Sequence, residues 1–410
     1  MPTVENTIVE TVLAIIRNRR TTEQGCAHQA PSVLPKSGGR SVKQREAQFS
    51  DFEIVAELKT RMGLSPDTIE NWRRLWRDNP TLRACPHPLP MGWVLESEGR
   101  IVGYLGNIAL LYQYAEKEFI ATTASGFAVE PDYRAWGPSL MASFYRQPDV
   151  DLFLNTTAMP AVGKIARALR AQPLPQKDYQ TVLFWVLDQY CFSKAVMRKL
   201  DINSKLVGIG GVGGLVALTF DGLIRSRQPR VLKKKLLVDE IELHDIGGEF
   251  EQLWLRKKEE GHRLLANRSP EVLRWHFDVP GSKRRTCVLV CRLKERLLGY
   301  AILRDQVDPR NGLKTSSLAD LVVEGDDSIV AQHLLLAAYE HAKKTKNHVF
   351  EVLGFPRYIR QICQEWKPYS RSYPASPFYY RAADRTLHQT LTMEQAWYAC
   401  PFDGDTTLAL

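Results

Sequence analysis

The stretch that decides the fold is Phe119–Ser139, which reads FIATTASGFAVEPDYRAWGPS. Its first half has the apolar and β-branched composition of a strand, and Pro131 ends that strand. Gly137 then marks the start of a helix that we expect to continue through Arg146. The first backbone N–H groups of a helix are unpaired and lie at the positive end of its dipole, so this loop is predicted to favour an anion such as phosphate.

Elements on both sides of this stretch predict a mixed sheet with helices. Upstream, the sequence Ser65-Pro-Asp starts a helix that carries two tryptophans, and a capping-box pattern at Ser50–Glu53 starts another. Additional strands are predicted over residues 42–48, a hairpin over 92–106, and single strands over 151–157 and 179–187. This alternation of strands and helices indicates an α/β domain.

The second half of the chain repeats this plan. Three short matches recur in the same order: Ser65-Pro-Asp-x-Ile with Ser269-Pro-Glu-x-Leu, Arg100-Ile-Val-Gly-Tyr with Arg296-Leu-Leu-Gly-Tyr, and Ala128-Val-Glu with Val322-Val-Glu. The offsets between the partners are 204, 196 and 194 residues, which agree to within the variation of loop lengths. The repeat favours a tandem duplication, and 410 residues are enough chain for two domains.

The repeated order of strand, helix, helix, hairpin, strand, loop, helix and strand resembles the GNAT acyltransferase superfamily. The resemblance covers roughly residues 42–190 and, more weakly, 236–392. It implies an α/β (α+β) fold of two tandem GNAT-like domains, each with a central mixed, mostly antiparallel sheet flanked by helices. We expect an N-terminal amphipathic helix and flexible linker (1–41), a donor-binding first domain (42–190), linker helices (191–235), and a degenerate second domain with a C-terminal extension (236–410).

In that superfamily, acyl-CoA lies along the central strand and its pyrophosphate rests on a loop of the form [QR]-x-x-G-x-[GA]. The matching loop here begins at Arg134, and it departs from the pattern because Ser139 replaces the last Gly or Ala, Pro138 lacks an N–H donor, and Trp136 is unusually large. The resemblance implies acetyl-CoA or another acyl-CoA as the donor. The residues that it implies are Phe127, Val129, Arg134, Ala135, Trp136, Gly137 and Ser139 for the donor, and Thr123, Ser125 and Asn155 for the substrate.

The equivalent loop in the second half, Glu324–Ala331, has no arginine and no Gly-x-Gly pattern. It places Asp326 and Asp327 where an anion would bind, and two carboxylates repel a pyrophosphate. We therefore expect only the first domain to hold the donor, with the second shaping the substrate pocket.

Transfer of an acyl group from a thioester to an amine needs a base, a proton for the thiolate, and donors for the developing oxyanion. The central strand of the first half carries only hydroxyl groups, so we place the acid at Tyr179 and the base at Asp320. A buried carboxylate at Asp320 would have a raised pKa, which suits a base; the alternative is that Asp320 pairs with an arginine or caps a turn. Asp403 and Asp405 form either an acidic rim that attracts an amine or a solvated turn.

The resemblance favours an N-acyltransferase, with acetyl as the expected acyl group, that acts on an amine of a small metabolite or amino sugar in the cleft between the domains. One alternative takes the acyl group from an acyl carrier protein or, as Fem-type transferases do, from aminoacyl-tRNA. A different class is a catalytically silent tandem protein that binds a partner or a membrane.

Composition limits the partners and the compartment. The net charge of +9 over 410 residues is diffuse and gives no case for nucleic acid. The seven cysteines show no disulfide framework or metal-ligand spacing, so we expect a reducing cytoplasm and no metal, with Cys287 and Cys291 as buried apolar side chains. Residues 206–220 are too short to span a bilayer; they predict a linker helix or, as the alternative, a peripheral membrane contact.

Overall fold

The computed structural model describes residues 41–199, 236–282, 284–372 and 377–408. The predicted N-terminal helix and the apolar run 206–220 lie outside these residues, and α6 (Gln189–Lys199) begins the predicted linker. Within the described ranges, no helix is both long enough and apolar enough to cross a membrane.

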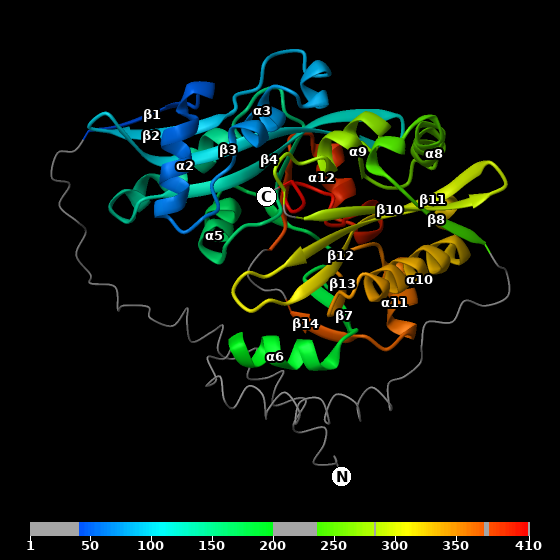
Figure 1. Ribbon diagram of the computed structural model, residues 1–410. Coiled ribbons are helices and arrows are strands. Elements are labelled where there is room, and N and C mark those ends of the chain that lie inside the picture. Colours follow the sequence, from blue (N-terminus) through cyan, green and yellow to red (C-terminus); the bar gives the residue numbers. More distant parts are fainter. Residues whose placement is uncertain (1–40, 200–235, 283, 373–376, 409–410) are drawn as a thin grey trace, which may run out of the picture.

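The described residues form two mixed sheets with helices around them (Figure 1). The first sheet has the order β1 (Val42–Glu46), β2 (Gly92–Ser97), β3 (Arg100–Tyr114), β4 (Lys117–Val129), β5 (Leu152–Asn155), β15 (Tyr379–Ala382) and β6 (Gln172–Pro173), with β9 (Leu265–Ala266) beside β3. The second sheet has the order β14 (Tyr369–Ser372), β7 (Thr181–Val186), β13 (Val349–Val352), β12 (Lys314–Val323), β11 (Arg296–Val307), β10 (Arg285–Leu293) and β8 (Leu237–Ile241).

The helices follow the same plan in both halves. The first half has α2 (Phe52–Arg61), α3 (Ile69–Trp76), α4 (Gly137–Tyr145) and α5 (Pro160–Ala168), and the second has α8 (Gly248–Glu259), α9 (Pro270–Phe277), α10 (Ser328–Lys344), α11 (Arg357–Glu365) and α12 (Arg385–Leu391). The short 3-10 helices are η1 (Phe49–Asp51), η2 (Pro80–Arg83), η3 (Pro131–Trp136), η4 (Leu243–Asp245), η5 (Glu324–Asp326) and η6 (Glu394–Ala396). Even a local detail recurs, because η1 and η4 both begin with a reciprocal capping box. The duplication inferred from sequence is thus visible in the order of elements.

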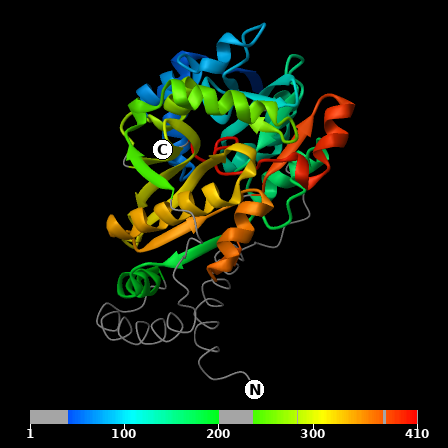
Figure 2. The same cartoon turned by 90° about the vertical axis from the view of Figure 1, so that its right-hand side faces the viewer.

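The two halves exchange strands at the ends of their sheets. Strand β7, which belongs to the first half of the sequence, pairs antiparallel with β13 of the second sheet. Strand β15, from the second half, pairs antiparallel with β5 of the first sheet, and Figure 2 shows it with α12 beside first-half elements. The strand predicted over residues 179–187 therefore exists, but it completes the second sheet, and each sheet needs both halves of the chain.

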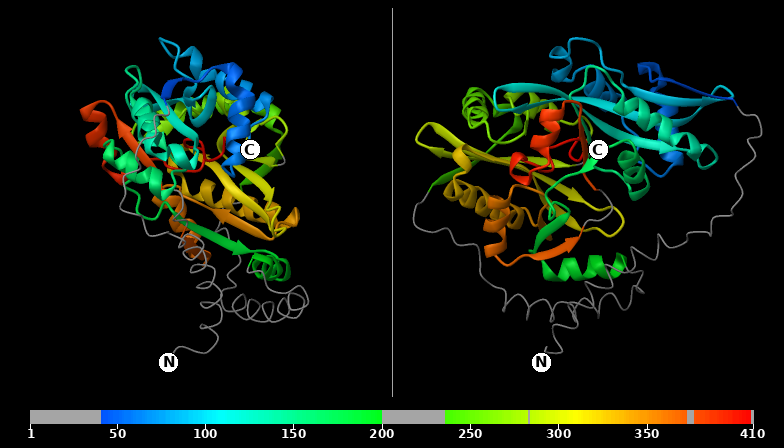
Figure 3. Two further views of the ribbon diagram at one scale, coloured as in Figure 1. Left: turned by 90° about the vertical axis from the view of Figure 1, so that its left-hand side faces the viewer. Right: turned by 180° about the vertical axis from the view of Figure 1, so that it is seen from behind.

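The C-terminal segment, which we define as residues 398–408, lies between the two sheets (Figure 3). Tyr112 of β3 donates a hydrogen bond of 2.8 Å to Asp403, and the Cys400 thiol lies 3.4 Å from Asp320 of β12. Nearly all of its side chains are buried. The segment thus holds the facing sheets together through their interior.

Candidate active site

The first sheet opens where its two central parallel strands diverge. Pairing between β4 and β5 is limited to Ala121–Thr123 and Leu152–Leu154, whereas β4 continues to Val129. The register of β3 with β4 shifts by one residue near Gly126, whose positive φ of 64° suits a bulge. The last residues of β4 therefore have no partner on the β5 side. We call this place the first divergence.

The predicted phosphate loop follows the first divergence directly. Residues 131–136 form η3, and α4 starts at Gly137 with no side-chain cap. Gly137 packs on β4, since a Cβ there would lie 3.2 Å from the Phe127 ring and 3.9 Å from Val129. Ser139 is half-buried, and its hydroxyl donates to the Trp136 carbonyl oxygen at 2.7 Å instead of facing outward.

The side chains of this loop are open to solvent. Arg134, Ala135 and Trp136 are exposed, Trp136 at 45%. Among the described residues, the Arg134 guanidinium has no hydrogen-bond or ion-pair partner, whereas its carbonyl oxygen accepts from the Gly137 N–H. A free guanidinium beside an uncapped helix start is a combination that binds anions.

The corresponding place in the second half is closed by its own carboxylates. Asp327 caps α10 by accepting hydrogen bonds from the N–H groups of Ile329 and Val330 at 2.8 and 3.3 Å. Asp326 accepts from Lys257 at 2.8 Å, and burial and this lysine are the largest influences on its pKa, which is lowered overall. The donors that would hold an anion are thus already used.

Strands β12 and β13 also diverge, because they pair only over Thr315–Leu318 and Val349–Val352 while β12 continues to Val323. The C-terminal segment fills this second divergence, where the Tyr398 hydroxyl donates to the Leu321 carbonyl oxygen. The Phe355 N–H donates to the Ala399 carbonyl oxygen at 2.8 Å.

Asp405 of the same segment lies at the first divergence. Its carboxylate accepts hydrogen bonds from Thr156 at 2.8 Å and Thr157 at 3.0 Å, just beyond β5, and the Ser125 hydroxyl of β4 lies close enough to influence its pKa. Burial raises the pKa of Asp405, although these hydroxyl groups oppose the shift. Sequence reasoning expected an acidic rim or a solvated turn; instead Asp403 and Asp405 are 4% and 5% exposed and belong to the interior.

The two predicted catalytic residues both contact Cys400. The Tyr179 hydroxyl donates to the Cys400 carbonyl oxygen at 3.5 Å, and burial raises the pKa of Tyr179 well above 10. Asp320 is fully buried and accepts from Arg268 at 3.0 Å and from Tyr300 at 2.9 Å. The second of the two interpretations of Asp320, a structural ion pair with an arginine, matches these contacts.

The predicted substrate residues lie along β4 and β5. Thr123 is buried and its hydroxyl has no hydrogen-bond partner, while Asn155 is buried where β5 pairs with Tyr379 of β15. Only Ser125 of the three reaches Asp405. Thr156 and Thr157 were missed as site residues, although they are the last two residues of the strand predicted over 151–157; the observed strand ends at Asn155.

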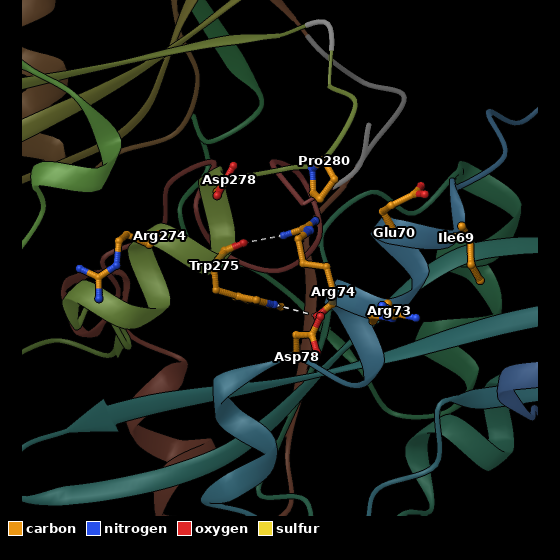
Figure 4. A pocket seen from close by; sticks show the side chains of 9 residues that line it. All are labelled: Ile69, Glu70, Arg73, Arg74, Asp78, Arg274, Trp275, Asp278 and Pro280. Atoms are coloured by element: carbon orange, nitrogen blue, oxygen red, sulfur yellow. Dashed lines mark hydrogen bonds between the residues drawn. The ribbon is translucent and has the colours of Figure 1, made fainter.

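A pocket of about 500 Å³ lies between α3 of the first half and α9 of the second (Figure 4). Arg74 and Trp275 bridge these helices at its floor, because Arg74 Nη1 donates to the Trp275 carbonyl oxygen and Trp275 Nε1 donates to the Arg74 carbonyl oxygen, each at 2.8 Å. The remaining lining residues are Ile69, Glu70, Arg73, Asp78, Arg274, Asp278 and Pro280. The pocket therefore presents both acidic and basic groups.

Arg74 connects this pocket to the first divergence. Its Nη2 donates to the Leu408 carbonyl oxygen at 3.0 Å, and the Leu408 N–H donates to the carbonyl oxygen of Asp405 at 3.2 Å. Arg304 lies behind it, 5% exposed, with no hydrogen-bond partner for any of its guanidinium nitrogens. Burial lowers the pKa of Arg74 to about 10, with a further contribution from Arg304.

Comparisons with known proteins agree on the fold. No protein-family model and no curated protein matches the sequence. A GCN5-related N-acetyltransferase from Anabaena variabilis superposes with a TM-score of 0.52 at 11% identity, over 84% of this chain and 73% of that chain. Saccharomyces cerevisiae N-myristoyltransferase with bound myristoyl-CoA superposes with a TM-score of 0.52 at 13% identity, over 88% of this chain and 86% of that chain. A probable N-acyltransferase from Enterococcus faecalis superposes with a TM-score of 0.52 at 9% identity, over 84% of this chain and 73% of that chain. The chain has the tandem GNAT fold, as its sequence predicted.

Proposed function

We propose that this protein is an acyl-CoA-dependent N-acyltransferase that moves an acyl group, with acetyl as the first candidate, to an amine of a small metabolite or amino sugar. The observation that carries the proposal is the contrast between the two helix starts. The start of α4 has no side-chain cap and lies next to the exposed Arg134 side chain, whereas the start of α10 is capped by Asp327. One of the two copies thus keeps the means to hold a pyrophosphate.

The donor would bind across the loop and the first divergence. The helix start and Arg134 would hold the pyrophosphate, and the unpaired edge of β4 beyond Thr123 would bind the pantetheine amides through backbone groups. This arrangement directs the thioester toward Ser125 and Asp405. The similar structures include a GCN5-related N-acetyltransferase and an N-myristoyltransferase with bound myristoyl-CoA, which is compatible with this class of donor.

The acceptor would enter from the pocket between α3 and α9. Its volume of about 500 Å³ suits a small molecule, and its carboxylates Glu70, Asp78 and Asp278 attract an amine. Arg73, which also lines the pocket, suits an acceptor that also carries an anionic group.

Asp405 is our candidate for the base, because its pKa is raised and it lies at the first divergence. The amine nitrogen attacks the thioester carbon, the C–S bond breaks, the nitrogen gives up a proton to Asp405, and the thiolate takes up a proton. Tyr179, which burial keeps protonated, remains the candidate donor of that last proton.

The test is calorimetric titration of the full chain with acetyl-CoA. Arg134→Glu is expected to weaken binding by about tenfold or more, since a charge-assisted contact contributes about 1.5–3 kcal/mol. Arg146→Glu is the matched control, because it makes the same charge change on an exposed arginine at the other end of α4. Absence of binding, or equal binding by both variants, contradicts the proposal.

A parallel titration with acetyl-pantetheine, which lacks the pyrophosphate, separates the two kinds of donor. Acetyl-CoA should bind more tightly if CoA is the donor. Equal affinity for the two compounds would favour an acyl carrier protein.

A further inference from the structure

A second cluster of reactive side chains lies on the far side of the second sheet, away from the C-terminal segment. Glu240 of β8, Cys287 of β10 and His341 of α10 bring one ligand atom each to within 4.8 Å of the others. His341 Nδ1 lies 3.1 Å from Glu240 Oε2 and 3.4 Å from Cys287 Sγ. The cluster is separate from the candidate active site and uses none of its residues.

The register of the strands explains why these groups meet. Glu240 pairs with Leu289, two residues from Cys287 on β10, so both side chains project from the same face of the sheet. Helix α10 packs on that face and contacts β8, β10 and β11. The His341 ring, in the last turns of α10, therefore lies directly over the strand edge.

The distances suit a metal ion. With metal–nitrogen and metal–oxygen bonds of about 2.0–2.2 Å and a metal–sulfur bond of about 2.3 Å, tetrahedral geometry separates ligands by about 3.4–3.6 Å. The observed separations of 3.1 and 3.4 Å are close to these values. Thiolate, imidazole and carboxylate together form a set that Zn²⁺ accepts.

The other nitrogen of His341 supplies an independent indication. His341 is 6% exposed, and its Nε2 has no hydrogen-bond partner. It faces Asp305 Oδ2 at 3.9 Å, and the second oxygen of Asp305 is buried and unpartnered as well. When a metal takes Nδ1, Nε2 carries the proton and points toward a carboxylate, which is how metal-bound histidines are commonly oriented.

Access to the cluster is compatible with binding of a cation. β8 is the edge strand of its sheet, and the Glu240 side chain is 45% exposed. The cluster can therefore be reached from solvent.

We propose that Glu240, Cys287 and His341 bind one Zn²⁺, with Asp305 as the positioning residue for His341 and a fourth coordination position open to water. The ion would fasten α10 to β8 and β10. This site goes beyond the proposed acyl transfer and does not depend on it.

A similar trio, Asp188, Cys191 and His348, carries no such proposal. Asp188 already accepts from the N–H of Cys191 at the start of α6, and His348 Nδ1 accepts from the N–H of Lys314 at 3.2 Å. These groups have structural partners, and none of the three is buried. Cys191→Ser is therefore a useful background in which to test the first cluster.

The test uses the full chain, freed of metal by a chelator, in the Cys191→Ser background. Titration with Zn²⁺ should show one site per chain, and Co²⁺ should give a thiolate-to-metal charge-transfer absorption. Cys287→Ser should abolish that absorption, whereas Cys291→Ser, the control on the same strand and under the same helix, should keep it. Because Glu240 is partly exposed, Glu240→Gln leaves the fold intact and should weaken Zn²⁺ binding by about tenfold or more.

Asp305→Asn should weaken Zn²⁺ binding by about 10- to 100-fold and retain the charge-transfer absorption, as expected of a residue that acts through His341. The proposal is overturned if the Cys191→Ser protein binds no Zn²⁺, if the absorption survives Cys287→Ser, or if Glu240→Gln binds as tightly as its parent.

Discussion

Replacing Arg268 by methionine should cost the protein a large part of its stability. Arg268 and Asp320 are 1% and 0% exposed, and Nε lies 3.0 Å from Oδ2. Without Arg268, Asp320 keeps the Tyr300 hydroxyl and a weak contact to the Cys400 thiol at 3.4 Å. Removing one partner of a buried ion pair costs about 3–5 kcal/mol, because the other charge stays buried and uncompensated.

Urea unfolding followed by tryptophan fluorescence measures the change in the free energy of unfolding. Arg83→Met is the matched control, since Arg83 also pairs with a carboxylate, that of Glu271, but the two side chains are 72% and 51% exposed. The control should lose about 0–1 kcal/mol. A loss for Arg268→Met that does not exceed the loss for the control refutes the reasoning.

The same pair decides the role of Asp320. Asp320→Asn should lower stability and leave the activity per folded molecule largely unchanged, because both oxygens of the carboxylate are already bound within the core. A fall of about 10²-fold or more in kcat with unchanged stability would restore Asp320 as the catalytic base.

Two further predictions concern the interior near the first divergence. Asp405→Asn should lower kcat by about 10²–10⁴-fold and remove the acidic limb of the pH–rate profile. Since burial raises the pKa of Asp405 above 3.8, the stability that its protonated form contributes is present below pH 3.8 and is lost as the pH rises through the raised pKa. Asp405→Asn should therefore be more stable than the wild type at neutral pH, and the difference should shrink as the pH falls. Urea unfolding at several pH values measures this difference, and a difference that does not change with pH contradicts the prediction. Arg304→Met should raise the free energy of unfolding by about 1 kcal/mol or more, because a buried guanidinium without a hydrogen-bond partner is removed. A clear loss of stability in the same urea assay would show that Arg304 is compensated.

Local patterns were sufficient for the fold but not for how the halves combine. The two copies could be recognised because each strand, turn and helix start is encoded by neighbouring residues, such as Arg100–Tyr104 and Arg296–Tyr300 at the starts of β3 and β11. The exchange of β7 and β15 between the sheets could not be predicted. Nothing in the sequence of β7, Thr181–Val186, shows that this strand pairs with β13 rather than with β5. Sheet-edge pairing depends on distant chain geometry rather than on local composition.

The candidate site shows the same division. The loop at Arg134 was predicted because a strand, a loop and a helix follow one another in the chain. Asp405 was noticed but placed in solvent, since its hydrogen bond to Thr156 spans 249 residues. The burial of Cys287 was predicted from its apolar neighbours and is confirmed, but its approach to His341, 54 residues away, left no signal in the sequence.

The asymmetry between the two copies follows from where the C-terminal segment goes. In the second sheet this segment enters the divergence of β12 and β13 and joins Cys400 to Asp320. In the first sheet it brings a carboxylate, Asp405, to the end of β5 and leaves the start of α4 uncovered. A single chain end thus closes one potential donor site with structural contacts and supplies a titratable group to the other. Because both effects come from one continuous segment, changes that displace it should affect stability through the second sheet and the proposed acyl transfer through the first.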